Sequence, residues 1–469
     1  MIYILPKEAQ KLMIKIRKAG FQVFAVGGCV RDIIMGRETN DWDFTTNADP
    51  SQIQSLFPEG FYDNKFGTVG VPIEKSKVKN LSQAQSQDQK SMVIYEITTF
   101  RSEFGYSDHR HPDKIAWGKT LEEDLQRRDF TINAMAFDGK KIIDLFGGQK
   151  DLNNHLIKAV GDPSIRFSED ALRMMRAIRI ATELHFLIEE KTFNAIKQNV
   201  LLIKKISSER IRDELLKILS SDYPVDGIKL LRNAGLLSTV LPELEKCFGV
   251  EQKSPGRHHI YDVGTHSILS LKSCPSTDPI VRLATLLHDV GKPPTFKKEN
   301  GWLITFFNHE IIAASIVRNI ADRLHFPKKD RERLITLVRW HQFTVDERQT
   351  DSALRRFIRR VGKENLEDML ALRVGDRLGG GARETSWRLE EFKKRLVEVQ
   401  KQPFTVSDLK VDGYDVMEKL NIRPGPMVGK VLNILFTEVT EAGKKNERKY
   451  LLKKIKDLGK KLTELPDRR

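Results

Sequence analysis

The sequence predicts an α+β protein in which an N-terminal α/β head is followed by an all-α remainder. Strand-like apolar runs, at residues 24–26 and 92–98, fall within the first 150 residues. A glycine-containing turn follows Asp144, and beyond it apolar side chains recur with helical spacing. With 469 residues the chain is too long for one hydrophobic core, so two to four domains are expected.

The charge of the chain indicates a polyanionic partner. Lysine and arginine number 79 against 64 acidic residues, which gives a formal net charge of +15. Nucleic acid is the simplest partner for this excess, although a merely soluble basic protein has the same composition. Cys29, Cys247 and Cys274 have neither disulfide nor metal-binding spacing, which favours a reducing compartment. Without an apolar leader or a run of about 18 apolar residues, we expect a cytoplasmic protein with no membrane partner.

The first 35 residues predict a helix, a strand, a phosphate-binding turn and a second helix in succession. Residues 6–20 form an amphipathic pattern, and residues 24–26 form a buried strand that ends at Gly27 and Gly28. Glycines let an anion approach the backbone, and the N-terminus of a helix over residues 30–35 would offer it free N–H groups. A Gly-Gly pair is more often an ordinary turn, so this signal alone is weak.

Asp41 and Asp43 are the leading candidates for catalytic residues and metal ligands. In a strand, residues i and i+2 face the same side, so both carboxylates would converge on one point. Two carboxylates beside a phosphate-binding turn are what a pair of Mg²⁺ ions requires to align a triphosphate for in-line attack. A D-x-D sequence is usually a solvated loop, but its closeness to the glycine turn strengthens the prediction of a joint site.

The next segments of the head are a polar insertion, a strand and a loop. Residues 75–90 are rich in Gln and Ser, which predicts a surface insertion without a core. Glu96, in the strand at 92–98, is either a third carboxylate of the metal site or an edge residue that faces water. Residues 101–114 predict a charged, aromatic loop that could move over the active site.

A short basic motif ends the head. Arg127, Arg128 and Asp129 precede an apolar-rich segment that holds Asn133. An arginine pair beside a triphosphate would neutralise charge as pyrophosphate departs. The same three residues would equally form a salt bridge at the end of a helix.

Residues 167–181 predict a helix that reads nucleobases. Ser168 is the expected N-cap, and five charged side chains share a slowly turning stripe: Glu169, Asp170, Arg173, Arg176 and Arg179. The simpler interpretation is a row of surface salt bridges, each contributing ~0.2–0.5 kcal/mol. A carboxylate that accepts from an exocyclic amine would instead select cytosine or adenine, because guanine and uracil present an acceptor there. An adjacent arginine would donate to the neighbouring ring acceptor, so no nucleic-acid template is needed.

Five stretches together resemble the class II tRNA nucleotidyltransferases, the family of CCA-adding enzymes and bacterial poly(A) polymerases. They are GGCVRD with DWDFTT, TFRSEFGYSDHRHPD, RRDFTINAMA, EDALRMMRAIR and ISSERIRDELLKIL. The resemblance implies a polymerase-β-like head with a mixed sheet and two Mg²⁺ ions on Asp41 and Asp43. It also implies a nucleotide-binding set made of Gly27, Gly28, Arg31, Asp32, Arg128, Asp129, Asn133, Glu169, Asp170, Arg173, Arg176 and Arg179. The loop at 101–114 would be the element used in switching from C to A, which is shortened in enzymes that add only CC but not here.

The function implied by this resemblance is addition of C, C and A to the 3′ end of tRNA. CTP and ATP would be the substrates, and pyrophosphate the leaving group. Within the family, an A-adding enzyme or a poly(A) polymerase has the same motifs. Outside it, the alternatives are a phosphohydrolase and an RNA-binding protein without chemistry, and the paired carboxylates argue against the latter.

A second constellation of polar residues lies in the C-terminal half. His288 and Asp289 are adjacent at the end of an apolar helical run, and His266 and Asp376 could complete an octahedral N/O site for Mg²⁺, Mn²⁺ or a similar ion. This set resembles the four-ligand pattern of HD phosphohydrolases, which implies hydrolysis of phosphomonoesters or cyclic phosphodiesters. His309 and His341 are additional and would serve a second metal or a phosphate. A helical scaffold that only supports RNA binding is the alternative.

These motifs predict four regions along the chain. They are the nucleotidyltransferase head at 1–150, a helical neck at 151–250, an HD-type region at 251–380 and a basic helical tail at 381–469. Pairs such as Lys444-Lys445 and Lys460-Lys461 would contact RNA phosphates without reading sequence, although any single pair also suits a solvated helix face. The sequence indicates no oligomeric state.

Overall fold

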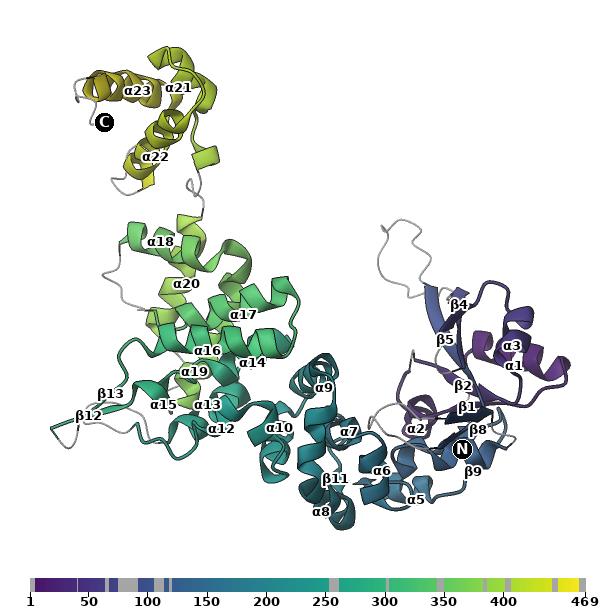
Figure 1. Cartoon of the computed structure of the whole chain (residues 1–469). Helices are drawn as coiled ribbons and strands as arrows, with labels where there is room; N and C mark the ends of the chain where they lie inside the picture. Colours follow the sequence, from purple (N-terminus) through teal and green to yellow (C-terminus); the bar gives the residue numbers. More distant parts are fainter. Residues whose placement is uncertain are drawn as a thin grey trace. The chain divides into compact units, whose positions relative to one another are not determined.

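The computed structural model describes residues 5–39, 41–63, 67–74, 92–104, 114–117, 120–252, 261–300, 303–343, 350–382, 386–400, 406–440 and 446–463 (Figure 1). The chain divides into two compact units. The N-terminal unit contains residues 1–246 with 277–279 and 320–326, and the C-terminal unit contains the remainder. The finer division into four regions stays a prediction.

The head of the N-terminal unit is a seven-stranded mixed sheet, drawn in purple and blue in Figure 1. The strand order is β3-β4-β5-β2-β1-β8-β9, in which β2 and β5 are parallel and all other neighbours are antiparallel. The strands are β1 Val23–Val26, β2 Asp43–Thr46, β3 Phe61–Asp63, β4 Thr68–Glu74, β5 Met92–Thr99, β8 Met135–Phe137 and β9 Ile142–Asp144. The predicted strands at 24–26 and 92–98 are therefore confirmed as β1 and β5.

The helices of this unit follow the expected order. They are α1 Lys7–Lys18, α2 Gly28–Ile34, α3 Pro50–Leu56, α4 Leu121–Gln126, α5 Gly148–Asn153, α6 Pro163–Glu169, α7 Leu172–Leu184, α8 Glu190–Asn199, α9 Ser208–Ser220, α10 Pro224–Asn233, α11 Leu237–Val240 and α12 Pro242–Glu245. Helix α1 confirms the amphipathic pattern at 6–20, because Ala9, Leu12, Met13 and Ile16 form its buried face.

Two local predictions in this unit are wrong. Part of the expected loop at 101–114 is a strand, because β6 Arg101–Phe104 pairs antiparallel with β7 Lys114–Trp117; residues 105–113 lie outside the described residues. Ser168 is not an N-cap but lies in the last turn of α6, and the expected single helix is interrupted at Asp170. Asp170 has extended backbone angles, and its Oδ1 accepts from the Leu172 N–H at 3.0 Å, so this carboxylate begins α7. The predicted insertion at 75–90 also lies outside the described residues.

The C-terminal unit is mostly helical. Its helices are α13 Val263–Ser273, α14 Pro279–Leu287, α15 Lys292–Thr295, α16 His309–Arg323, α17 Lys328–Trp340, α18 Asp351–Val361, α19 Leu366–Gly379, α20 Trp387–Val399, α21 Gly413–Leu420, α22 Pro426–Thr440 and α23 Arg448–Thr463. The expectation that everything after residue 150 is helical needs a small correction. The N-terminal unit pairs β10 Leu156–Ile157 with β11 Leu187–Ile188, and the C-terminal unit pairs β12 Lys297–Glu299 with β13 Leu303–Thr305.

The last three helices have a hydrophobic core of their own. Its buried residues include Val416, Val431, Leu435, Leu451 and Ile455 from α21, α22 and α23. On α23, the side chains of Lys449, Lys453 and Lys456 are exposed on the outside of this packed cluster. In the parts of the chain that are described, no helix combines the length and the apolar character that a membrane crossing requires.

Candidate active sites

The glycine corner forms between β1 and α2, with the helix beginning two residues earlier than predicted. Gly27 has a φ of +83°, a conformation that side-chain-bearing residues rarely adopt. A Cβ atom at Gly27 would lie 3.1 Å from Arg128 Nη1 and 3.5 Å from Asp43 Oδ2. The missing side chain therefore lets a cation and a carboxylate from two other segments converge on this turn.

The carboxylates lie beside this corner. Asp43 is the first residue of β2 and Asp41 is exposed just before the strand, while Trp42 between them is buried and stacks on Phe44 with ring centroids 6.3 Å apart. This alternation directs the tryptophan into the core and the two aspartates to the other side. Glu96 on β5 is the register partner of Asp43.

Electrostatics at Asp43 fit a divalent cation. Burial, together with the negative charges of Asp41 and Glu96, raises the pKa of its carboxyl to about 6, although the charge of Arg128 acts in the opposite direction. Acidic groups that repel one another in this way are stabilised as carboxylates by a bound metal, and oxygen ligands suit Mg²⁺. The residues present therefore fit the predicted pair of metal ions.

The basic motif after α4 is fixed by a buried acid. Asp124 accepts from Arg127 Nη2 at 2.6 Å and from Arg128 Nη2 at 3.2 Å. Its side chain is fully buried, and although burial raises its pKa, the two guanidinium groups lower that pKa below its usual value. The ion pair with Asp124 therefore fixes the side chain of Arg128 in its position beside the glycine corner.

Asp129 and Arg176 connect the head to α7. Arg176 donates from Nε at 2.9 Å and from Nη2 at 2.6 Å to Asp129 Oδ2, and Asn133 Nδ2 donates to Asp129 Oδ1 at 3.2 Å. Burial of Asp129 works against ionisation, but Arg176 lowers the pKa of this carboxyl to about 2. The pair therefore stays charged at neutral pH and fixes the position of α7 beside the head.

The nucleobase-reading residues form a network that includes one residue not predicted. Arg210, on α9, donates from Nη2 to Asp170 Oδ2 at 2.7 Å. Arg173 does not pair with Asp170; it donates to Glu169 Oε2 at 2.5 Å and to the Arg127 carbonyl at 3.1 Å. The stretch ISSERIRDELLKIL carries part of the family resemblance, but its sequence alone predicts no role for Arg210. The sequence signal that could have identified Arg210 is its position within a stretch that resembles a nucleotide-binding family.

A pocket of about 260 Å³ collects most of these side chains. Its lining residues are Gly27, Gly28, Asp43, Arg127, Arg128, Asp129, Asn133, Asp170, Arg173, Arg176 and Arg210. Five predicted residues are not part of this lining, namely Arg31, Asp32, Asp41, Glu169 and Arg179. Arg31 donates to Asp32 and Asn133, and Arg179 pairs with Glu183 and Glu214. Their direct contact with a nucleotide stays a prediction.

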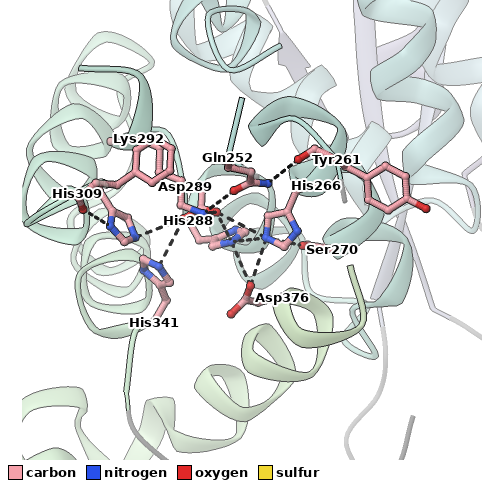
Figure 2. Close-up of polar contacts among 12 residues, drawn as sticks. Gln252, Tyr261, His266, Ser270, His288, Asp289, Lys292, His309, His341 and Asp376 are labelled. Carbon is pink, nitrogen blue, oxygen red and sulfur yellow. Dashed lines mark hydrogen bonds and ion pairs between the residues drawn. The ribbon is translucent and has the colours of Figure 1, made fainter. Parts of the chain in front are cut away.

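A second site lies in the C-terminal unit, where the four predicted ligands meet (Figure 2). His266 comes from α13, His288 and Asp289 follow α14, and Asp376 comes from α19. His266 Nε2 lies 3.2 Å from both His288 Nε2 and Asp376 Oδ1, and His288 Nε2 lies 3.1 Å from Asp289 Oδ2. Ligand atoms held about 2.1 Å from one metal are separated by about 3.0–3.4 Å, so this spacing fits a divalent cation.

The pKa values of the histidines and aspartates in this site indicate that the site favours a bound positive charge. Burial opposes protonation of His288, but Asp289 and Asp376 raise the pKa of its imidazole to about 10. Burial would raise the pKa values of the two aspartates, yet the surrounding imidazoles hold both well below their usual range. Burial, together with the charge of His288, lowers the pKa of His341 to about 3. A bound metal would replace the proton on His288, because a coordinating imidazole must be neutral.

Three parts of the chain match known protein families. Residues 23–158 match the poly A polymerase head domain, residues 185–248 match a "Probable RNA and SrmB- binding site of polymerase A", and residues 265–378 match the HD domain. The chain is 33% identical over 466 residues to a CCA-adding enzyme of Limosilactobacillus reuteri, with 96% of both proteins covered.

Solved structures agree as well. The CCA-adding enzyme of Bacillus stearothermophilus, in complex with CTP, is 27% identical and superposes with a TM-score of 0.68, covering 98% of this chain and all of the other. A Thermotoga maritima CCA-adding enzyme in complex with tRNA has a TM-score of 0.58 at 19% identity, with 97% and 96% of the two chains covered, which shows the same fold. The predicted architecture, a nucleotidyltransferase head with a mixed sheet followed by mostly helical regions, is thereby confirmed. With a curated relative matched over nearly its whole length, the chain belongs to the class II CCA-adding enzymes.

Proposed function

We propose that this chain completes the 3′ end of tRNA by adding C, C and A from CTP and ATP, with release of pyrophosphate. The observation that carries the proposal is the pocket in which Asp43, Arg128 and Asp170 line one cavity. A carboxylate for metals, a cation for phosphate and a carboxylate for a base are thus available to one bound nucleotide. The similarity to CCA-adding enzymes with bound CTP and tRNA supports the same substrates.

In this mechanism, Asp41 and Asp43 would hold two Mg²⁺ ions. Bound there, the metals would supply charge neutralisation for the triphosphate and activation of the 3′-hydroxyl. Gly27 lets the phosphates approach the backbone, and Arg128, fixed by Asp124, donates to their oxygens. Most of the acceleration then comes from positioning and electrostatics, since the protein has little covalent chemistry to perform in phosphoryl transfer.

Base selection is assigned to Asp170 and Arg173. The carboxylate of Asp170 accepts from the exocyclic amine that cytosine and adenine share, while Arg173 donates to the adjacent ring acceptor. Arg210 acts as a positioning residue, because its guanidinium donates to Asp170 and orients this carboxylate, which lines the pocket. Asp129 and Arg176 hold α7 against the head, so the residues that bind the base keep a fixed position relative to those that bind the triphosphate.

Extension assays with tRNA transcripts test this proposal. Transcripts that end before, within and after the CC are incubated with CTP, ATP or both, and the products are resolved at single-nucleotide resolution. We expect completion to CCA on each truncated transcript and no further growth. Addition of A only to the CC-ended transcript would identify an A-adding enzyme, and long A tails on unrelated RNA would identify a poly(A) polymerase. No extension of any transcript would contradict nucleotide addition.

Gly27→Ala provides a sharper test of the phosphate corner. The new Cβ atom would displace Arg128 Nη1, so we expect nucleotide addition to fall at least about 10-fold, because small misplacements in an active site can cost ~100-fold. Gly20→Ala is the matched control, since Gly20 has a similar φ of +88° but no atom within 4 Å of the added Cβ. Equal losses of activity in both variants would assign the effect to backbone strain instead of to Arg128.

A second activity is favoured by the C-terminal site. We propose that His266, His288, Asp289 and Asp376 bind a divalent cation that supports phosphate-ester hydrolysis. The spacing of their ligand atoms, 3.1–3.5 Å, is the observation that favours this function. The two imidazoles suit Mn²⁺ or another transition metal better than Mg²⁺, which prefers an all-oxygen site.

A further inference from the structure

We infer that the exposed aromatic ring of Phe61 stacks on the 3′-terminal base of the RNA and so forms a binding site for the end that receives the new nucleotide. The inference rests on the proposed nucleotide addition at Asp43 and identifies the part of the head that holds the second substrate. Phe61 is the first residue of β3, the strand at one edge of the sheet, and its side chain is 52% exposed.

Phe61 lies in one row of the sheet with the proposed metal-binding carboxylate. Asp43 on β2 pairs with Glu96 on β5. Glu96 pairs in turn with Gly70 on β4, and Gly70 pairs with Phe61 on β3. Side chains of directly paired residues point to the same face of a sheet. Because neighbouring strands lie about 4.8 Å apart, Gly70 is about 10 Å from Asp43 along this row.

The glycine on β4 gives the ring its place on this face. A Cβ atom at Gly70 would lie 2.5 Å from Cζ, 2.8 Å from Cε2 and 3.0 Å from Cε1 of Phe61. The far end of the ring therefore occupies the space that a side chain at position 70 would fill. The ring thus lies on the face of the sheet that carries Glu96 and Asp43.

The half of this face that β3, β4 and β5 form is accessible. On the opposite face Val69 and Ile97 are buried, and α3 contacts all three strands (Figure 1). On the face of Asp43, Leu125 of α4 packs with residues of β1 and β8. Ile94 on β5, which shares this face, is 48% exposed. In the described part of the sheet, an apolar surface next to the proposed metal site is therefore open to a ligand.

The nucleotide pocket lies on the other side of Asp43 from this row. Among the described residues that line the pocket, none belongs to β3, β4 or β5. In phosphoryl transfer the attacking and leaving oxygens lie roughly in line. Pyrophosphate would leave toward Gly27 and Arg128, so the attacking 3′-hydroxyl must arrive from the side of β5. The terminal base of the RNA is thereby brought to the surface that carries Phe61.

The chemistry of this surface favours a base over a phosphate group. The described side chains that share it on β4 and β5 include no lysine or arginine; they are Thr68, Pro72, Glu74, Met92, Ile94, Glu96 and Thr98. Phosphate oxygens would be repelled by Glu96, whereas an aromatic ring stacks on any base without reading its sequence. Such tolerance suits a growing end, because the terminal base changes after each addition.

Phe61→Ala in the full chain tests the inference. Initial rates of A addition are measured on a tRNA transcript that ends in CC, with the transcript and ATP varied in turn. We expect kcat/KM for the transcript to fall about 10-fold, because stacking on one base is lost, while the KM for ATP stays within about twofold. Phe61→Trp should restore kcat/KM, since a larger ring also stacks.

Two further variants separate the position of the ring from a general effect on the fold. Gly70→Ala is expected to lower kcat/KM for the transcript in the same way, because the new Cβ atom displaces the end of the Phe61 ring. Ile14→Ala is the matched control, since Ile14 is similarly exposed, at 50%, but lies on α1. Its kcat/KM should match that of the unmodified chain within about twofold. An equal loss in Ile14→Ala would overturn the assignment to Phe61.

A transcript whose 3′-terminal nucleotide lacks its base provides the decisive comparison. On this RNA, Phe61→Ala and the unmodified chain should have the same kcat/KM, because the partner of the ring is absent. A loss that persists on the abasic transcript, or no loss on the intact one, would overturn the stacking site and leave nucleotide addition intact. No addition by the unmodified chain to the intact transcript would instead refute the proposed function and the inference with it.

Discussion

Asp43→Ala is expected to reduce nucleotide addition by about 1,000-fold or more. Metal ligation contributes several kcal/mol of transition-state stabilisation, and about 4 kcal/mol corresponds to a factor of about 1,000 in rate. Asp43 lines the pocket together with Gly27 and Arg128, and its Oδ2 would lie 3.5 Å from a Cβ atom at Gly27. Single-turnover addition of one C to a tRNA transcript, measured at saturating CTP and Mg²⁺, would report the loss.

Two further variants define the cause of that loss. Asp376→Ala removes a proposed ligand of the C-terminal site, so addition should stay within about twofold of the unmodified chain if the two sites act independently. Persistence of addition in Asp43→Ala would refute the metal assignment in the head.

Glu96→Gln tests the register partner of Asp43. A loss as large as that of Asp43→Ala would identify Glu96 as a third ligand, and a loss under about tenfold would identify it as a neighbouring charge.

The parts of the head that depend on local sequence were predictable. The apolar run of β1, the glycine turn and the start of α2 are consecutive, and the backbone conformation of Gly27 follows from residues within that turn. Alternation around Trp42 similarly placed the two aspartates on one side of the chain. In each case the information lies within a few residues, where periodicity and turn chemistry are reliable.

What the sequence could not predict depends on contacts between distant segments. Asp170 and Arg210 are separated by 40 positions, and only the packing of α7 against α9 brings them together. The interruption at Asp170 was also missed, because apolar spacing continues across it while the side chain bonds to the Leu172 N–H. The roles of His309 and His341 were left open for the same reason, since α16 and α17 must first be placed around Asp289.

Asp170→Ala is expected to lower discrimination of C and A against U and G by about 10- to 100-fold. A hydrogen bond to a charged group contributes about 1.5–3 kcal/mol, and about 1.4 kcal/mol is a tenfold change. The relevant quantity is the ratio of kcat/KM values for CTP and UTP on a transcript that lacks CCA, and for ATP and GTP on one that ends in CC. Unchanged ratios would refute base reading by this carboxylate, even if overall activity fell.

Arg210→Met separates positioning from direct reading. Removing the guanidinium leaves Asp170 without its partner at 2.7 Å, so discrimination should fall about 10-fold, and Arg210→Lys should restore part of it by returning a cation. Arg212→Met is the matched control, because Arg212 lies on the same helix but pairs with the adjacent Asp213 and does not line the pocket. If Arg210→Met lowered addition of all four nucleotides equally, Arg210 would serve only the stability of α7 and α9. If only the discrimination between nucleotides fell, the orientation of the Asp170 carboxylate would select the base without a nucleic-acid template.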